Sequence, residues 1–215
     1  MNKAPRGIKA DVAYSYKKLE AVARSLRSYL GLSTTDKIDG LELFDKLPAI
    51  SIDGISYGVE TGVDILQGVE AEASFDAEKK HYQILLTPET YDLLEARNPH
   101  GTWVLVHEYA HVVLHGKLLQ RLASMAIQTR AALYKGTPTP HSFFMDTEWQ
   151  TDSLTAAFLM PAVGISHLEQ DTSYRFMGLS PSLEFVVSIH FGTSLEAANY
   201  RVGTFRQRRE ELVGS

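Results

Sequence analysis

Apolar residues recur at helical spacing over several stretches of the chain. Between residues 11 and 30 they alternate with lysines and arginines on the other faces, and Gly31 follows as a natural helix end. Asn98 and Pro99 are typical of an N-cap and a first helical residue, and the pattern after them predicts a helix to about His115. Similar patterns predict further helices over residues 41–47, 118–134, 148–160, 180–190 and from 193 onward.

Short stretches before the middle of the chain alternate between apolar and polar residues, which is typical of β-strands. Residues 71–75 and 81–87 flank a charged turn and predict an antiparallel hairpin, and residues 49–56 predict a strand that enters a turn at Asp53-Gly54. The strand over residues 81–87 has two interpretations. It is either an exposed edge that an extended peptide could join, or an interior strand of a small sheet.

Helices therefore dominate, and one small antiparallel sheet accompanies them, which predicts an α+β fold. Gly192 separates the last two predicted helices, and Thr193 with Glu196 offers a capping box for the second of them. This pair resembles a helix-turn-helix. We expect a main domain over residues 1–175 and a C-terminal helical hairpin over residues 176–215 that packs on it.

The composition narrows the classes of protein that remain. The 215 residues contain no cysteine, which excludes disulfides, thiol catalysis and cysteine-ligated metal sites. No apolar run reaches the ~18 residues of a membrane span, and the basic N-terminus lacks the apolar segment of a signal peptide. The net charge of -5 disfavours direct nucleic-acid binding. We expect a cytoplasmic protein with no membrane partner.

The sequence His107-Glu108-Tyr109-Ala110-His111 carries the candidate chemistry. Residues four apart on a helix lie about 6 Å apart on nearly one face, so both imidazoles can reach one ion at the ~2.0–2.1 Å that zinc requires. Glu108 lies beside them and is expected to act as general base, accepting a proton from water that zinc makes more acidic.

A metal site competes with two ordinary interpretations of these histidines. They could form a solvent-facing polar stripe, or they could be core histidines that hydrogen bonds satisfy. The residues around them from Trp103 to Leu114 are almost entirely apolar, so the helix is predicted to be buried. Unpaired buried imidazoles and a carboxylate would be costly, which favours a metal site.

A zinc site needs a third protein ligand, and the sequence offers two candidates. His115 lies about 12 Å along the helix from His107, too far for both to reach one ion, so we expect a structural role for it at the helix end. Glu148 and Asp152 share one face of the next strong helix. Glu148 could complete the coordination and Asp152 could orient a ligating histidine, but the same spacing also fits an ordinary solvated acidic helix start.

The two segments HEYAHVVLH and EWQTDSLTAAFLMP resemble the ImmA/IrrE family of metallopeptidases. That family pairs a helix of the form HExxHxxxH with a second helix that reads E-x-E-A-[ND]-x-F-A-A-x-L-L-M-P. The resemblance implies that Glu148 is the third zinc ligand and that Asp152 occupies the Asn/Asp position. The chain departs from the pattern at Gln150, where the family has glutamate, and at Thr151, where it has alanine.

The resemblance implies a zincin-like endopeptidase that cleaves a regulatory protein, typically a helix-turn-helix repressor or an antitoxin-like partner. Limited cleavage of such a repressor would change gene expression in a stress response. A further hypothesis is a toxin or effector protease whose target is a cellular protein other than a repressor. Two imidazoles and a carboxylate would also accept Mn²⁺ or Fe²⁺ in place of Zn²⁺.

A function without cleavage remains as an alternative: a metal-stabilised regulator that binds DNA or protein. The C-terminal hairpin supports it, since arginines cluster there, but the net charge favours a packing role for the hairpin. The arginines are Arg201, Arg206, Arg208 and Arg209.

A peptidase also needs a group that stabilises the oxyanion. The sequence leaves six candidates open: His141, His167, His190, Tyr14, Tyr16 and Tyr134.

Overall fold

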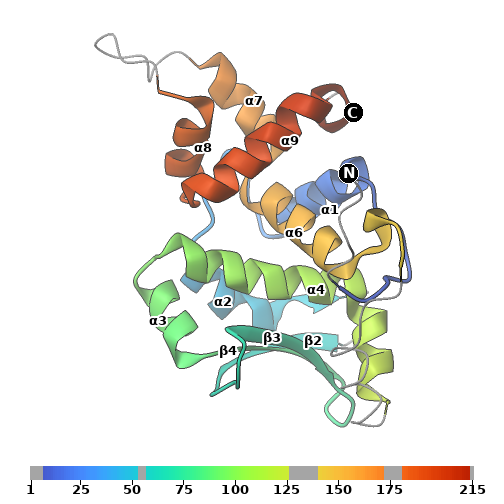
Figure 1. The fold of residues 1–215 in the computed structure, drawn as a ribbon. Coiled ribbons are helices and arrows are strands. Elements are labelled where there is room, and N and C mark those ends of the chain that lie inside the picture. The colour runs from blue at the N-terminus through green and yellow to red at the C-terminus, as the bar shows by residue number, and fades with distance from the viewer. Residues whose placement is uncertain (1–6, 53–56, 126–139, 172–180, 214–215) are drawn as a thin grey trace. The chain divides into compact units, whose positions relative to one another are not determined.

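The computed structural model describes residues 7–52, 57–125, 140–171 and 181–213 (Figure 1). The chain forms two compact units, and each combines segments that are distant in sequence. Unit 1 comprises Met1–Tyr14 and Asp39–Asp152, and unit 2 comprises Ser15–Ile38 and Ser153–Ser215. The predicted domain boundary between residues 175 and 176 lies outside the described residues.

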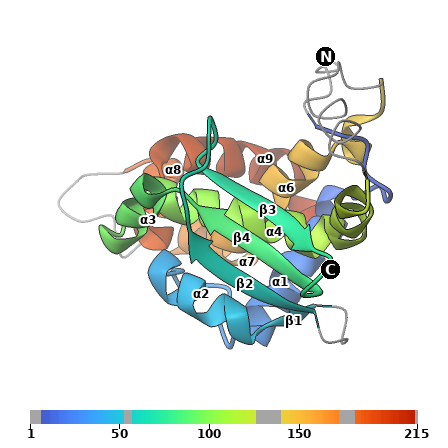
Figure 2. The same cartoon turned by 90° about the horizontal axis from the view of Figure 1, so that it is seen from below.

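Unit 1 contains a sheet with the strand order β1-β2-β4-β3 (Figure 2). The hairpin predicted from the sequence is confirmed, since β3 (Ala71–Asp76) pairs antiparallel with β4 (His81–Leu86). β2 (Tyr57–Val63) pairs parallel with β4, so the sheet is mixed and not purely antiparallel. Of the two interpretations left open for β4, the interior strand is confirmed and the exposed edge is wrong. β3 lies at one end of the strand order instead, and β1 (Ser51–Ile52) lies at the other.

One long helix, α4 (Pro99–Ala123), covers one face of this sheet (Figures 1 and 2). Asn98 caps it through a hydrogen bond from the backbone N–H of His100, as the sequence predicts. The alternate residues Tyr82, Ile84 and Leu86 of β4 are buried on the α4 side. The Tyr82 hydroxyl accepts a hydrogen bond from Gln120 of α4, which fixes the helix on the sheet.

Shorter elements complete unit 1. α2 (Gly40–Lys46) begins after Asp39, whose carboxylate accepts from two backbone N–H groups of the first turn of the helix. Thr87 caps α3 (Pro88–Glu95) in the same way, and Pro88 is the first residue of this helix. The predicted turn at Asp53-Gly54 lies outside the described residues. The remaining elements of this unit are η1 (Leu47–Ala49), η2 (Phe143–Met145) and the first part of α6 (Thr147–Leu159).

Unit 2 is helical within its described residues. α8 (Leu183–Phe191) ends at Gly192, whose φ of 64° is a left-handed conformation that favours glycine. The predicted cap of α9 is shifted by one residue: Ser194 accepts from the backbone N–H of Ala197, while the Thr193 hydroxyl faces the sulfur of Met160. The elements are α1 (Tyr16–Tyr29), the rest of α6, α7 (Ala162–Gln170), α8 (Leu183–Phe191) and α9 (Leu195–Val213).

A buried ion pair joins the helices of unit 2. The Arg201 guanidinium of α9 donates to the Glu20 carboxylate of α1 and to the backbone carbonyl of Met160. Glu20 also accepts from the backbone N–H of Ala162 at the start of α7. Both charged side chains are almost inaccessible to solvent, and each has protein partners for its charge. No helix in the described part of the chain is both long and apolar enough to cross a membrane.

Candidate metal centre

α4 brings the residues of the histidine motif to its one polar stripe. Helical periodicity places His107 and His111 one turn apart, and their ring centroids lie 4.9 Å from each other. The flanking Val106, Ala110 and Val112 are buried, so the two imidazoles stand at the border of the hydrophobic core. The predicted burial of this helix is confirmed.

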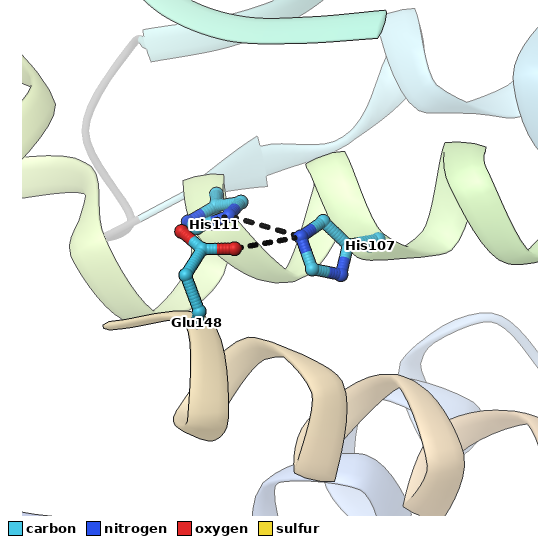
Figure 3. Close-up of side chains that lie close together, drawn as sticks. All are labelled: His107, His111 and Glu148. Carbon is cyan, nitrogen blue, oxygen red and sulfur yellow. Dashed lines mark hydrogen bonds and ion pairs between the residues drawn. The ribbon is translucent and has the colours of Figure 1, made fainter. Parts of the chain in front are cut away.

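Three donor atoms from α4 and α6 converge at this stripe (Figure 3). The Nε2 atoms of His107 and His111 lie 3.2 Å apart. One carboxylate oxygen of Glu148 lies 3.4 Å from the Nε2 atom of His107, and the other lies 3.5 Å from that of His111. Two ligands bound at ~2.0–2.1 Å to a tetrahedral ion are about 3.3 Å apart. The spacing therefore fits a single ion, and this cluster could hold a metal ion.

The other nitrogen of each histidine ring faces α6. The Nδ1 atom of His107 lies 3.2 Å from a carboxylate oxygen of Asp152, and the Nδ1 atom of His111 lies 3.3 Å from the hydroxyl of Thr151. A hydrogen bond at Nδ1 fixes the ring and leaves the Nε2 lone pair for a cation. Glu148, Thr151 and Asp152 are spaced i, i+3 and i+4, so one face of α6 presents all three groups.

The start of α6 is anchored immediately before Glu148. The Asp146 carboxylate accepts from the backbone N–H groups of Trp149 and Gly7, at 2.9 and 3.0 Å. Gly7 packs closely here, because a Cβ atom at this position would lie 2.8 Å from Cγ of Glu148 and 2.9 Å from its backbone nitrogen. Gln150 adds a further anchor by donating to the carbonyls of Val12 and Phe144. The orientation of Glu148 thus depends on the segment around Gly7.

Electrostatics at the centre favour a shared positive charge. Burial lowers the pKa of His107, but hydrogen bonds to Asp152 and Glu148 outweigh it and raise that pKa to about 10. Burial alone would raise the pKa of Glu148, yet the hydrogen bonds from His107 and His111 hold it well below its usual range. The carboxylates therefore attract a cation, whether a proton or a metal ion.

Glu108 lies next to the donor cluster without belonging to it. Burial raises the pKa of Glu108, while the positive charges of His111 and His107 oppose this rise. The backbone N–H of Ala73 on β3 also hydrogen-bonds to the Glu108 carboxyl. The edge strand of the sheet thus reaches the carboxyl group that the sequence assigns to base catalysis.

His115 lies outside the donor cluster, as its spacing from His107 predicts. It does not end the helix. α4 continues to Ala123 across a kink at His115, where φ is -122° and ψ is 17°. The next residue is Gly116, and a Cβ atom at this position would lie only 2.5 Å from the Tyr82 hydroxyl oxygen. The close approach of Tyr82 therefore favours glycine here. Burial and the positive charge of His111 lower the pKa of the His115 ring to about 4, while a hydrogen bond to the backbone of Thr147 opposes this.

The oxyanion candidates belong to both units. The side chain of His141 is almost inaccessible to solvent, and its Nε2 atom lies 3.3 Å from a carboxylate oxygen of Asp146. His190 contacts the backbone carbonyl of Thr35 at 2.8 Å within unit 2. His167 and Tyr16 also belong to unit 2, on α7 and α1. The remaining two are Tyr14, in unit 1, and Tyr134, which lies outside the described residues.

Two contacts of the centre could not be found from the sequence. The hydrogen bond from Ala73 is a backbone contact, so no side chain signals it. Thr151 has the i+3 spacing from Glu148 that would have pointed to the shared face. A threonine in a helix is, however, an ordinary residue without the signature of a metal site.

Comparison with known proteins found similarities among solved structures. No protein-family model matches the sequence, and no curated protein matches it. Among solved structures, the chain is similar to a transcriptional regulator from Mycobacterium tuberculosis, with 14% identity and a TM-score of 0.47. The match covers 90% of this chain and 49% of that one, so the chain spans about half the length of the structure it resembles.

Proposed function

We propose that the protein is a metal-dependent endopeptidase whose ion is held by His107, His111 and Glu148. The observation that carries this proposal is the convergence of two imidazoles and one carboxylate. The two Nε2 atoms lie 3.2 Å apart, close to the ligand spacing of a tetrahedral site, and each lies 3.4 to 3.5 Å from one of the two Glu148 oxygens. Zinc is the expected ion, because two imidazoles and one carboxylate with a remaining open position are typical of catalytic zinc. Mn²⁺ and Fe²⁺ also suit this donor set.

The residues around the ion have distinct roles. A bound cation supplies Lewis acidity, which makes water more acidic and polarises a peptide carbonyl. Glu108 accepts the proton of the attacking water and returns it to the departing amine. The raised pKa of Glu108 suits this exchange, because a carboxyl group whose pKa lies closer to neutral pH can both accept and donate a proton. Asp152 keeps His107 in the orientation that ligation needs.

The edge strand β3 is the expected binding surface for the peptide, in place of β4. The backbone carbonyl of Glu70 accepts a hydrogen bond from the N–H of Thr87, which follows β4. Along a strand, the backbone groups of successive residues point alternately to one side and to the other. The N–H and C=O groups of Ala71 and Phe75, and the C=O group of Ala73, therefore point to the open edge. An extended peptide that joins this edge would pass Glu108, which Ala73 contacts.

The proposed substrate is a helix-turn-helix repressor or an antitoxin-like protein. This part of the proposal rests on the sequence resemblance to the ImmA/IrrE family at the histidine helix and at the helix of Glu148. Limited cleavage of such a protein would release the genes that it represses. The reaction would take place in the cytoplasm, where such regulators act.

The alternative, a regulator that binds DNA through the C-terminal hairpin, finds less support. Phosphate binding needs cationic side chains that are available to the backbone of the nucleic acid. Each arginine of the hairpin already faces a carboxylate of unit 2, so a phosphate would have to displace an acid. The pairs are Arg201 with Glu20, Arg206 with Glu184, Arg208 with Glu211 and Arg209 with Glu169.

A single substitution separates the two functions. Glu108→Gln keeps the shape of the side chain, leaves the three ligands in place and removes the base. We expect wild-type protein to produce a discrete fragment of a co-expressed helix-turn-helix protein encoded by the neighbouring gene. We expect Glu108→Gln to retain its metal and to produce about 10² to 10⁴ times less of this fragment. The exposed Glu78→Gln is the matched control. If Glu108→Gln retains both metal and full output, the peptidase proposal is wrong.

A further inference from the structure

The two ligating histidines have different partners on α6. His107 faces the charged carboxylate of Asp152 at 3.2 Å, whereas His111 faces the neutral hydroxyl of Thr151 at 3.3 Å. Both contacts involve Nδ1, and in both rings Nε2 points toward Glu148. The two contacts are therefore equivalent in geometry and differ in charge.

We propose that Thr151 is a positioning residue of the metal centre, which holds the imidazole of His111 in its ligating tautomer. For Nε2 to offer a lone pair to a cation, the ring proton of neutral His111 must be on Nδ1. The Thr151 hydroxyl oxygen lies where it can accept that proton in a hydrogen bond. This inference rests on the proposed metal centre, but it does not require that the protein cleaves peptides.

The surroundings of Thr151 restrict what else its hydroxyl can do for the ring. Thr151 is fully buried, so water does not compete at this position. A hydroxyl oxygen carries two lone pairs besides its own proton, so the Thr151 oxygen can accept from His111.

The difference in charge predicts unequal effects on the two histidines. A carboxylate partner makes an imidazole a stronger electron donor to a metal, and a hydroxyl does so less. His111 should therefore depend on Thr151 chiefly for its orientation. His107 should depend on Asp152 both for its orientation and for its basicity.

α6 provides a matched control for the removal of this hydroxyl. Thr155 lies one turn after Thr151 and is equally buried, but its hydroxyl has no hydrogen-bond partner within the described residues. Thr→Val replaces a hydroxyl by a methyl group at nearly constant volume. The change at residue 155 therefore reports the cost of the substitution itself, and the change at residue 151 adds the loss of the contact with His111.

The test measures zinc affinity by competition with a chelator of known affinity in Thr151→Val, Thr151→Ser and Thr155→Val. We expect Thr151→Val to weaken zinc binding by about 10- to 100-fold, the range typical of lost hydrogen bonds to metal ligands. Thr151→Ser retains the hydroxyl, so its zinc dissociation constant should stay within about threefold of the wild-type value. Thr155→Val should bind zinc as wild type does. Equal affinity of Thr151→Val and wild type would overturn the inference, as would an equal loss in Thr155→Val.

A spectroscopic readout separates positioning from a general loss of structure. In the Co²⁺-substituted protein, the visible absorption bands report the ligand geometry, so Thr151→Val should shift them while Thr155→Val leaves them unchanged. Unshifted bands in Thr151→Val, together with unchanged affinity, would assign Thr151 to packing alone. Failure of the metal centre itself is distinguishable, because wild type and Glu148→Ala would then bind zinc equally poorly.

Discussion

The chain contains two polar clusters, one buried and one partly exposed, that satisfy their charges in opposite ways. In unit 2, Glu20 and Arg201 form an ion pair, and backbone groups of Ala162 and Met160 complete their hydrogen bonds. In unit 1, His107 and His111 meet Glu148 with lone pairs facing one another at 3.2 to 3.5 Å. The first cluster contains its own cation, and the second has the geometry to receive one.

This difference distinguishes a structural from a functional use of buried charge. A buried ion pair with complete partners is costly to break but binds nothing further. Three acceptors at the spacing of a tetrahedral ion are stable together only when a cation or a proton joins them. Substitutions in the first cluster should therefore change the stability of the fold, and substitutions in the second should change the affinity for zinc.

The largest effect is expected at the ion pair of unit 2. Arg201→Leu leaves the buried Glu20 carboxylate without its partner, which should lower the free energy of unfolding by about 3–5 kcal/mol. Denaturant titration measures this loss. Replacing both residues, as Glu20→Leu with Arg201→Leu, should recover part of it. A stability within about 1 kcal/mol of wild type for Arg201→Leu would show that the pair is not a structural centre.

Removal of the metal comes next. A ligand that binds only the folded state at 100 times its dissociation constant stabilises that state by about 2.7 kcal/mol. Added zinc should therefore raise the unfolding temperature of the chelator-treated wild type, and should leave Glu148→Ala nearly unchanged. Differential scanning calorimetry at matched protein concentration provides the comparison. An equal rise in both proteins would place the stabilising ion elsewhere.

The packing of Gly7 should have a smaller effect on the metal centre. A Cβ atom at residue 7 would press on the backbone nitrogen of Glu148, so Gly7→Ala should displace this ligand. We expect zinc affinity to fall by roughly tenfold and the free energy of unfolding by about 1–3 kcal/mol. Gly203→Ala is the control, because the space around Gly203 is open. Unaltered zinc affinity in Gly7→Ala would show that the segment does not position Glu148.

The smallest effect concerns pH. The pKa of His107 is raised to about 10 in the metal-free protein, so below that pH the ring carries a proton that a metal ion must displace. Zinc affinity should therefore rise with pH, by about threefold from pH 7.0 to 7.5. Titration calorimetry in two buffers of different ionisation enthalpy should show about one proton released per ion. Proton release near zero at pH 7.5 would contradict the shared charge.

Much of the fold could be predicted because local signals and burial agree. The helix after Asn98, the hairpin of β3 and β4, and the helix of Glu148 follow from caps and periodicity. β2 was missed because its sequence, YGVETGV, contains two glycines and alternates weakly. It becomes a strand through parallel pairing with β4, a contact that no local pattern encodes.

The candidate site shows the same division. The spacing of His107 and His111 on one helix is a local property, so the sequence was sufficient for that pair. Glu148 required the approach of a second helix, and the sequence alone left its role open between a ligand and a solvated acid. The contribution of Thr151 depends on the rotation of α6 about its axis relative to α4. That rotation is set by tertiary packing, including the anchors around Asp146.

The central claim is that three side chains from two helices hold one ion. Zinc per chain, measured by native mass spectrometry after exchange into metal-free buffer, tests this claim most directly in wild type and Glu148→Ala. The account predicts one zinc ion per wild-type chain and almost none in the variant, with both proteins folded. Equal zinc content in the two proteins would contradict it.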